Sequence, residues 1–205
     1  SLEKHVPDLL PYFDSFCTMP IDTRGPDGAF HQVLDGVMQG SVLASAFFAV
    51  AMLDLQHDVE QTAADILDGW RATEGTEALP RRDAVGCTYL DDLGGGSLAV
   101  DAVLAYRLAA YHHLKDHLND GSAHMEPKDC TLLSNVLTVA ALKAAAERRG
   151  ASHLFGAFIG VDTPAALRGM IMVGVPIGTP QFVAARVAKV VAEKGLLRFR
   201  LLRTM

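Results

Sequence analysis

The chain has few cysteines, no excess of positive charge and no long uninterrupted apolar run, and each absence excludes a class of protein. Its net charge of −6 argues against a free-standing nucleic-acid-binding protein, whose surface is usually basic. The three cysteines show neither zinc-site spacing nor an even-numbered disulfide framework, which favours a reducing compartment. The longest apolar stretch, residues 42–55, contains Ser45 and Asp54 and is too short to span a bilayer.

We therefore expect an intracellular protein without a membrane segment, in the nucleus or an organelle. We expect no signal peptide, because residues 1–7 carry charges and no apolar run. Half of the residues are hydrophobic, which allows a sizeable core, and the length of 205 residues suits one domain, or one and a piece of another. Basic residues gather near the C-terminus, where we prefer a solvated helix face to a phosphate-binding patch: Arg186, Lys189, Lys194, Arg198, Arg200 and Arg203.

Hydrophobic periodicity and turn residues predict a mixed α+β chain without strict βαβ alternation. The expected helices are a long one from Ser41 or Ser45 to about Trp70, then residues 98–119, residues 136–149 up to Gly150, and a last helix from about residue 181. The expected strands are residues 30–34, 85–89, 130–133 and 170–175, the last ending at Pro176, with a loop at residues 71–83.

The most informative motif is the Tyr-Leu-Asp-Asp run at residues 89–92, which follows a β-prone segment and precedes three glycines at 94–96. This order predicts a strand that ends in a tight turn with Asp91 and Asp92 at its tip. Adjacent carboxylates repel one another unless a cation lies between them. Because Mg²⁺ prefers oxygen ligands, the pair suits metal-dependent phosphoryl transfer. Taken alone, the tetrapeptide also fits a solvated turn.

Two further segments are candidates for the same chemistry. Gln39 and Gly40 stand where an extended segment enters the long helix, and a glycine there lets another backbone or a nucleotide approach closely. Residues 126–128, Glu-Pro-Lys, lead into the strand expected at 130–133 and would bring the cation of Lys128 near the acidic turn.

Together these segments resemble the palm motifs of reverse transcriptases, especially those of non-LTR retrotransposons and group II introns. Residues 36–48 are similar to the second palm motif, Gly-x-x-Gln-Gly-x-Pro-Leu-Ser-Pro-x-Leu-Phe, and residues 89–92 match the catalytic Tyr-x-Asp-Asp turn. Residues 125–130 resemble the next motif, Asn-Pro-x-Lys, and residues 173–178 the primer-grip motif, Leu-Gly-x-x-Ile/Leu-Gly. The order agrees with the family, and the resemblance covers about residues 30–200.

The resemblance implies a polymerase palm, a ferredoxin-like antiparallel sheet with packed helices, followed by the start of a helical thumb. The implied division is a turn-rich N-terminal segment at 1–29, a palm at 30–180 and the first thumb helix at 181–205. The implied activity is that of an RNA-directed DNA polymerase, which uses an RNA template, a DNA primer and deoxynucleotides, with Mg²⁺ or Mn²⁺ as cofactor.

The family's roles transfer by position. Asp91 and Asp92 would hold the metals, with Asp91 as the expected direct ligand, and Lys128 would lie near the triphosphate as a general acid for pyrophosphate. The implied substrate-binding residues are Tyr89 under the primer end, Gln39 and Gly40 at the template and incoming nucleotide, and Gly174, Val175 and Pro176 (with Ile177) at the primer backbone.

Several departures from the family leave an alternative open. Residues 42–45 lack the usual Pro, Ser and Pro, and the glycines at 94–96 predict a poor second strand for the catalytic hairpin. Residues 8–15 imitate the first palm motif, which supplies a further metal-binding Asp, but they lie too close to Gln39 and contain Pro11. We expect the true first motif upstream of this chain. The alternative is a catalytically inactive, domesticated structural subunit of a ribonucleoprotein.

Two other sets of polar residues are interpreted as helix surface. His113 and His117 are four residues apart and could bind a metal, but no zinc-protease motif surrounds them, so a solvated face is preferred. The carboxylates of Asp54 and Asp58, also four apart, are likewise expected on a wet helix face.

Overall fold

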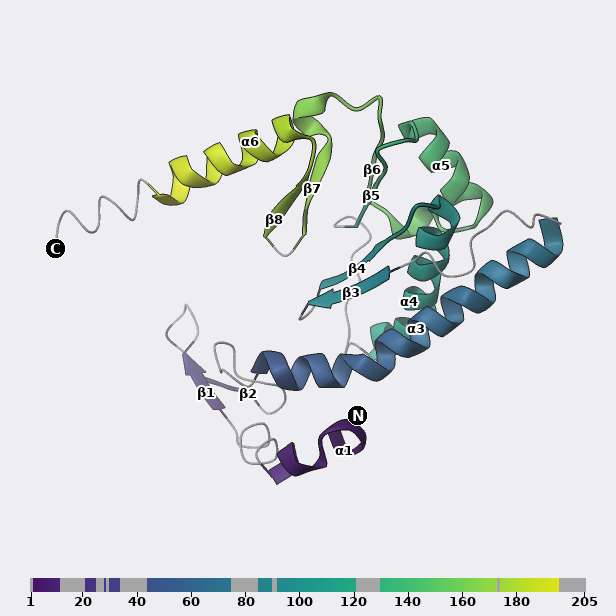
Figure 1. Cartoon of the computed structure of the whole chain (residues 1–205). Helices are drawn as coiled ribbons and strands as arrows, with labels where there is room; N and C mark the ends of the chain where they lie inside the picture. Colours follow the sequence, from purple (N-terminus) through teal and green to yellow (C-terminus); the bar gives the residue numbers. More distant parts are fainter. Residues whose placement is uncertain are drawn as a thin grey trace.

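The computed structural model describes residues 2–11, 21–24, 28, 30–33, 44–74, 85–89, 92–120, 130–172 and 174–195. Helices and short strands mix along this part of the chain, as Figure 1 shows, which confirms the α+β class at this coarse level. None of the helices in these ranges is long and apolar enough to cross a membrane.

The four predicted helices are present in the predicted order, with shifted ends, and a short helix, α1 (Leu2–His5), lies where a turn-rich segment was expected. The predicted four are α3 (Ala44–Glu74), α4 (Val100–Asp120), α5 (Val139–Arg148) and α6 (Pro180–Val190), with short 3-10 turns at Pro7–Leu9, Ser152–Leu154 and Ala165–Leu167 and a π-helical turn at Val191–Gly195. The loop predicted from residue 71 is wrong at its start, because α3 continues to Glu74. The helix predicted from residue 136 begins instead at Val139, where the Thr138 side chain accepts a hydrogen bond from the backbone N–H of Ala141.

In the described part of the chain, the strands form four separate two-stranded sheets. β1 (Ile21–Arg24) pairs with β2 (Phe30–Val33), β3 (Val85–Tyr89) with β4 (Asp92–Gly96), β5 (Thr131–Leu133) with β6 (Ala157–Ile159), and β7 (Gly169–Met172) with β8 (Val175–Gly178). The pair β5–β6 is parallel and the other three are antiparallel. Over the described residues, these pairs do not join into one sheet, and two strands, β1 and β6, fall where none was predicted.

The single strand predicted at residues 170–175 is wrong, because two antiparallel strands stand in its place. The chain turns back at Gly174, whose φ of +76° lies in the left-handed region that favours glycine, and the result is the β7–β8 hairpin. Pro176 was expected to end a strand but lies within β8, opposite Ile171. Proline is tolerated there because a two-stranded sheet consists of edge strands, where a missing N–H need not break a ladder.

The first hydrophobic cluster joins α3 to α4. Its α3 members recur every four residues, and its α4 members are mostly alanines, which let the two helices approach closely. The buried residues are Val59, Ala63 and Leu67 of α3 with Ala102, Ala105, Tyr106, Ala109 and Ala110 of α4. The larger residues of α4 that the sequence suggests as its apolar stripe, such as Leu104, do not make this contact.

The second cluster lies on another face of α4 and gathers α5 and β5 around it. Its buried members are Leu104, Leu132, Leu142, Ala145, Ala146, Ala151 and Leu154. Trp70, near the end of α3, packs against both clusters and is the single tryptophan of the chain. The two cores are therefore continuous through one side chain.

The N-terminal helix α1 is attached to α3 through one carboxylate. Lys4 Nζ and His5 Nε2 lie 3.1 Å and 2.9 Å from Oδ1 of Asp54. The hydrogen bond from His5, and then that from Lys4, lowers the pKa of Asp54 to about 2. Asp54 therefore lies on an exposed helix face, as expected, and there it pairs with two residues of α1.

A core truncation tests whether the second cluster carries the fold. Leu142 is fully buried, so Leu142→Ala should lower the free energy of unfolding by about 2–5 kcal/mol. The matched control, Leu167→Ala, removes a side chain that is 64% exposed and should change it by less than about 0.5 kcal/mol. Urea denaturation followed by circular dichroism measures both, and equal effects would contradict the assignment of this core.

Candidate functional site

The acidic motif lies at the tip of the β3–β4 hairpin. The register pairs Val85 with Gly96 at the open end and Tyr89 with Asp92 at the tip, so residues 90–91 alone connect the strands. Two-residue connections are the commonest hairpin loops. The predicted strand at 85–89 is confirmed, and Asp92, which was expected at the tip of the turn, begins the return strand. Residues 90 and 91, and the side chains of Tyr89 and Asp92, lie outside the described part.

The glycines that follow the motif form the return strand, contrary to the prediction of a poor one. A Cβ built on Gly95 would lie 2.9 Å from Cδ1 and 3.2 Å from Cε1 of Tyr106, a core residue of α4. Gly96 has open space at the same position. Glycine at 95 therefore lets the backbone of β4 lie directly on the aromatic ring, which offsets the weak strand propensity of the run.

The two strands of the hairpin rest on different helices. β3 contacts α3, whereas β4 contacts α4 (Figure 1). Gly95 of β4 lies close to the Tyr106 ring of α4. The position of the acidic tip thus depends on how α3 and α4 are held relative to one another. Their shared face is the cluster of small side chains described above.

The ends of α3 and α4 are joined by Arg149, at the C-terminal end of α5. Its Nη1 and Nη2 donate to the two carboxylate oxygens of Glu74, the last residue of α3, with Nη2 at 3.0 Å. Its Nε donates to Oδ1 of Asp101 in the first turn of α4, at 2.8 Å. The guanidinium carbon lies 4.3 Å from the ring centroid of Trp70.

This arrangement satisfies a charge that is almost withdrawn from water. The Arg149 side chain is 5% exposed, and that of Asp101 is 14% exposed. The hydrogen bonds to Asp101, and then to Glu74, raise the pKa of Arg149 further above its ordinary value, so the group stays charged. A planar guanidinium suits bidentate pairing and ring stacking at once, which an ammonium cannot reproduce.

The other predicted site residues are placed only in part. Gln39, Gly40, Asp91 and Lys128 lie outside the described residues, so their proximity to the hairpin stays a prediction. The strand predicted after Lys128 is confirmed as β5.

The residues predicted to support a primer form a second hairpin, β7–β8. Gly174 forms the turn between β7 and β8, and Val175 and Pro176 begin β8, next to α6. A hollow of about 140 Å³ separates this turn from α6, and its lining is Gly174, Pro176, Arg186, Val187, Val190 and Val191.

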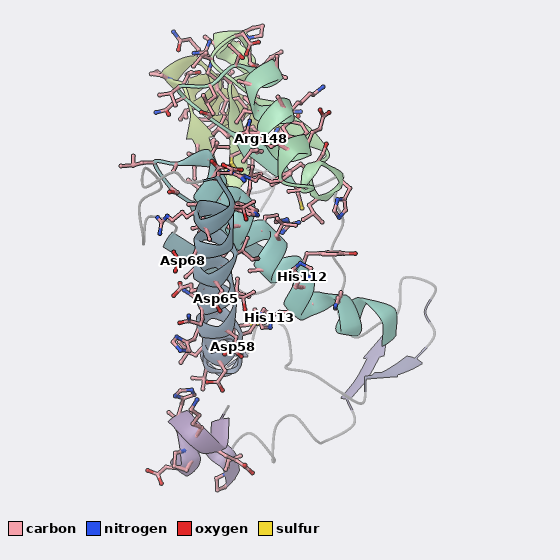
Figure 2. All side chains as sticks on the ribbon, turned by 90° about the vertical axis from the view of Figure 1, so that its right-hand side faces the viewer. Asp58, Asp65, Asp68, His112, His113 and Arg148 are labelled. Atoms are coloured by element: carbon pink, nitrogen blue, oxygen red, sulfur yellow. The ribbon has the colours of Figure 1, made fainter. Side chains whose placement is uncertain are left out.

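One predicted helix-surface residue makes a specific contact. The half-buried His113 of α4 has its Nε2 2.9 Å from Oγ1 of Thr62 on α3, so the expectation of a solvated face is wrong for this residue. Figure 2 shows Asp58, Asp65 and Asp68 along α3, and His112 and His113 on α4. Within the described ranges, no group of three His, Cys, Asp or Glu residues is placed to hold a metal ion.

The adjacent carboxylates at residues 91–92 stay the predicted donor set for a divalent cation, because residue 91 and the side chain of Asp92 lie outside the described part. Their oxygen chemistry suits Mg²⁺ or Mn²⁺, and a short hairpin loop keeps adjacent residues close to one tip. Arg149 was not predicted as a functional residue, because neither its spacing to Glu74 nor a motif marks the contact. The signal in the sequence that points to this contact is weak: Trp70 and Glu74, which both contact Arg149, are four residues apart and so share one helix face.

Comparison with known proteins adds no family: no family model, no curated protein and no solved structure matches the chain. Its function is therefore argued from the residues and geometry of the hairpin.

Substitution of Gly95 tests how the hairpin lies on α4. The methyl group of Gly95→Ala would meet the Tyr106 ring and should destabilise the protein by about 1–3 kcal/mol, the range for overpacking. Gly96→Ala adds the same methyl group where nothing lies within 4 Å, and should cost less. Denaturant unfolding of both variants measures the difference, and equal stabilities would contradict this packing.

Proposed function

We propose that the chain is a reverse-transcriptase-type palm region that performs nucleotidyl transfer with two divalent metals. Its site is the acidic tip of the β3–β4 hairpin, where Asp91 and Asp92 would hold Mg²⁺ or Mn²⁺. The substrates would be an RNA template, a DNA primer and deoxynucleotides. The resemblance of the four motifs, in the family's order, motivates the choice.

The observation that carries this proposal is the register of the hairpin. Pairing of Tyr89 with Asp92 leaves a two-residue tip, so the Tyr-x-Asp-Asp run stands at a turn rather than within a helix or a buried strand. A tight turn is the arrangement that brings two adjacent carboxylates to one edge, where a cation relieves their repulsion.

The order of the surrounding elements supports the same proposal. The long helix α3 follows the segment of Gln39 and Gly40, and β5 follows Lys128. The β7–β8 hairpin carries Gly174, Val175 and Pro176 and leads directly into α6 through Thr179, whose side chain accepts from the N–H of Phe182. This is the order expected of a primer-supporting hairpin that precedes the first thumb helix.

In the proposed reaction, the 3′-hydroxyl of the primer attacks the α-phosphorus of the nucleotide and pyrophosphate leaves. Bound divalent metal would supply charge neutralisation and a more acidic hydroxyl. Asp91 and Asp92 would hold the metal in register with the phosphates, Tyr89 would pack under the primer end, and Lys128 would give a proton to the departing pyrophosphate. A further carboxylate, from the first palm motif expected upstream of this chain or from another chain, would complete the metal site.

The competing candidate is a structural subunit of a ribonucleoprotein that has lost catalysis. One observation favours it: the described core consists of apolar side chains of α3, α4, α5 and β5, so the fold does not need the acids at 91–92. Packing would persist after their loss.

Primer extension on an RNA template, with Mg²⁺ or Mn²⁺, separates the two candidates. Asp91→Ala should lower the rate at least about 100-fold, because even outer-shell partners of metal ligands cost about 10–100-fold. Asp58→Ala is the matched control, an exposed carboxylate on α3 (Figure 2), and should leave the rate unchanged. Equal background from the unsubstituted chain and Asp91→Ala would contradict the enzymatic proposal and favour the structural subunit.

A further inference from the structure

We propose that Arg149 is the positioning residue of the acidic hairpin, because it joins the two ends of the segment that carries it. The role assigned to the acids rests on the proposed function. The link that Arg149 makes between Glu74 and Asp101 is inferred from its contacts and is tested without catalysis.

The hairpin lies within the connection from α3 to α4. That connection starts after Glu74 and ends before the first turn of α4, where Asp101 lies. Arg149 binds both carboxylates at once, the first through two nitrogens and the second through Nε. One side chain from α5 therefore closes the base of the whole segment.

Separation of the two helix ends would be transmitted to the tip. β3 contacts α3 and β4 contacts α4, so the strands are anchored on the two elements that Arg149 holds together. The contact between β4 and α4 is tightly packed, since a Cβ at Gly95 would lie only 2.9 Å from the Tyr106 ring. A shift between the helix ends must therefore strain or open the ladder from Val85–Gly96 to Tyr89–Asp92.

The environment of Arg149 suits a guanidinium better than any other side chain. The guanidinium stacks on Trp70, which packs against both hydrophobic clusters, and its side chain is 5% exposed. Loss of the guanidinium would leave the nearly buried carboxylate of Asp101 without this partner, an arrangement that proteins avoid. Lysine would keep the charge but would lose both the fork that spans the two carboxylates and the planar stack.

Hydrogen–deuterium exchange of the metal-free chain tests the inference. In Arg149→Met, amides of residues 85–96 should exchange at least about tenfold faster than in the unsubstituted chain, as expected when an ion pair no longer restrains a local segment. Amides of the α4 core, residues 104–110, should accelerate less, because they need wider opening. The control, Arg148→Met, removes the neighbouring exposed arginine of α5 (Figure 2) and should leave both regions unchanged.

Two further variants separate positioning from general stabilisation. Arg149→Lys should still loosen the hairpin, whereas a role limited to neutralising carboxylates would be rescued by lysine. Glu74→Gln removes one charged partner and keeps the stack on Trp70, so it carries the test if Arg149→Met fails to fold. It should also loosen residues 85–96 selectively.

Equal acceleration of the hairpin and the α4 core, or rescue by lysine, would overturn the positioning role. Neither outcome depends on metal or substrate. Failure of the chain to extend a primer would contradict the proposed polymerase function. The exchange result would still test the positioning role of Arg149.

Discussion

The position of the acidic hairpin depends on one nearly buried guanidinium at the meeting point of three helices. Arg149 lies at the end of α5, binds Glu74 at the end of α3 and Asp101 at the start of α4, and stacks on Trp70. Burial of a charge is costly, and this arrangement offsets the cost with three charge-assisted hydrogen bonds and a ring face. Because Trp70 touches both hydrophobic clusters, the same contact also links the two cores.

The contacts of Arg149 with the ends of α3 and α4, called the Arg149 frame below, determine where the acidic hairpin lies. Its return strand has a weak strand propensity, because the five residues of β4 include three consecutive glycines. Its stability therefore comes from the elements beneath it, namely α3 under β3 and the Tyr106 ring of α4 under β4. A glycine run that is unfavourable as an isolated strand becomes favourable once a backbone must lie against an aromatic ring.

Features set by local sequence were predictable, and those set by distant contacts were not. Periodicity and turn residues located α3, α4, α5 and the strand before the acidic tip, since each depends on neighbouring residues. The left-handed turn at Gly174, the parallel pairing of β5 with β6 and the shift of α4's shared face to alanines depend on partners chosen in three dimensions. The bond from Arg149 to Glu74 spans 75 positions, and no motif marks it.

The candidate site shows the same division. The Tyr-x-Asp-Asp run predicted a turn because its signal is contiguous, and the backbone register agrees. The expected neighbours Gln39, Gly40 and Lys128 come from distant segments outside the described part, so their convergence stays a prediction. The Arg149 frame could not be predicted, because its residues are ordinary charged groups on helices until packing removes them from water.

The central proposal is that the acidic tip of the β3–β4 hairpin binds a divalent metal. Electron paramagnetic resonance of free Mn²⁺, titrated with the unsubstituted chain and with Asp91→Ala, tests it most directly because the bound ion leaves the free signal. The account predicts saturable loss of free Mn²⁺ with the unsubstituted chain and a much weaker loss with Asp91→Ala. The same free Mn²⁺ with both proteins would contradict it.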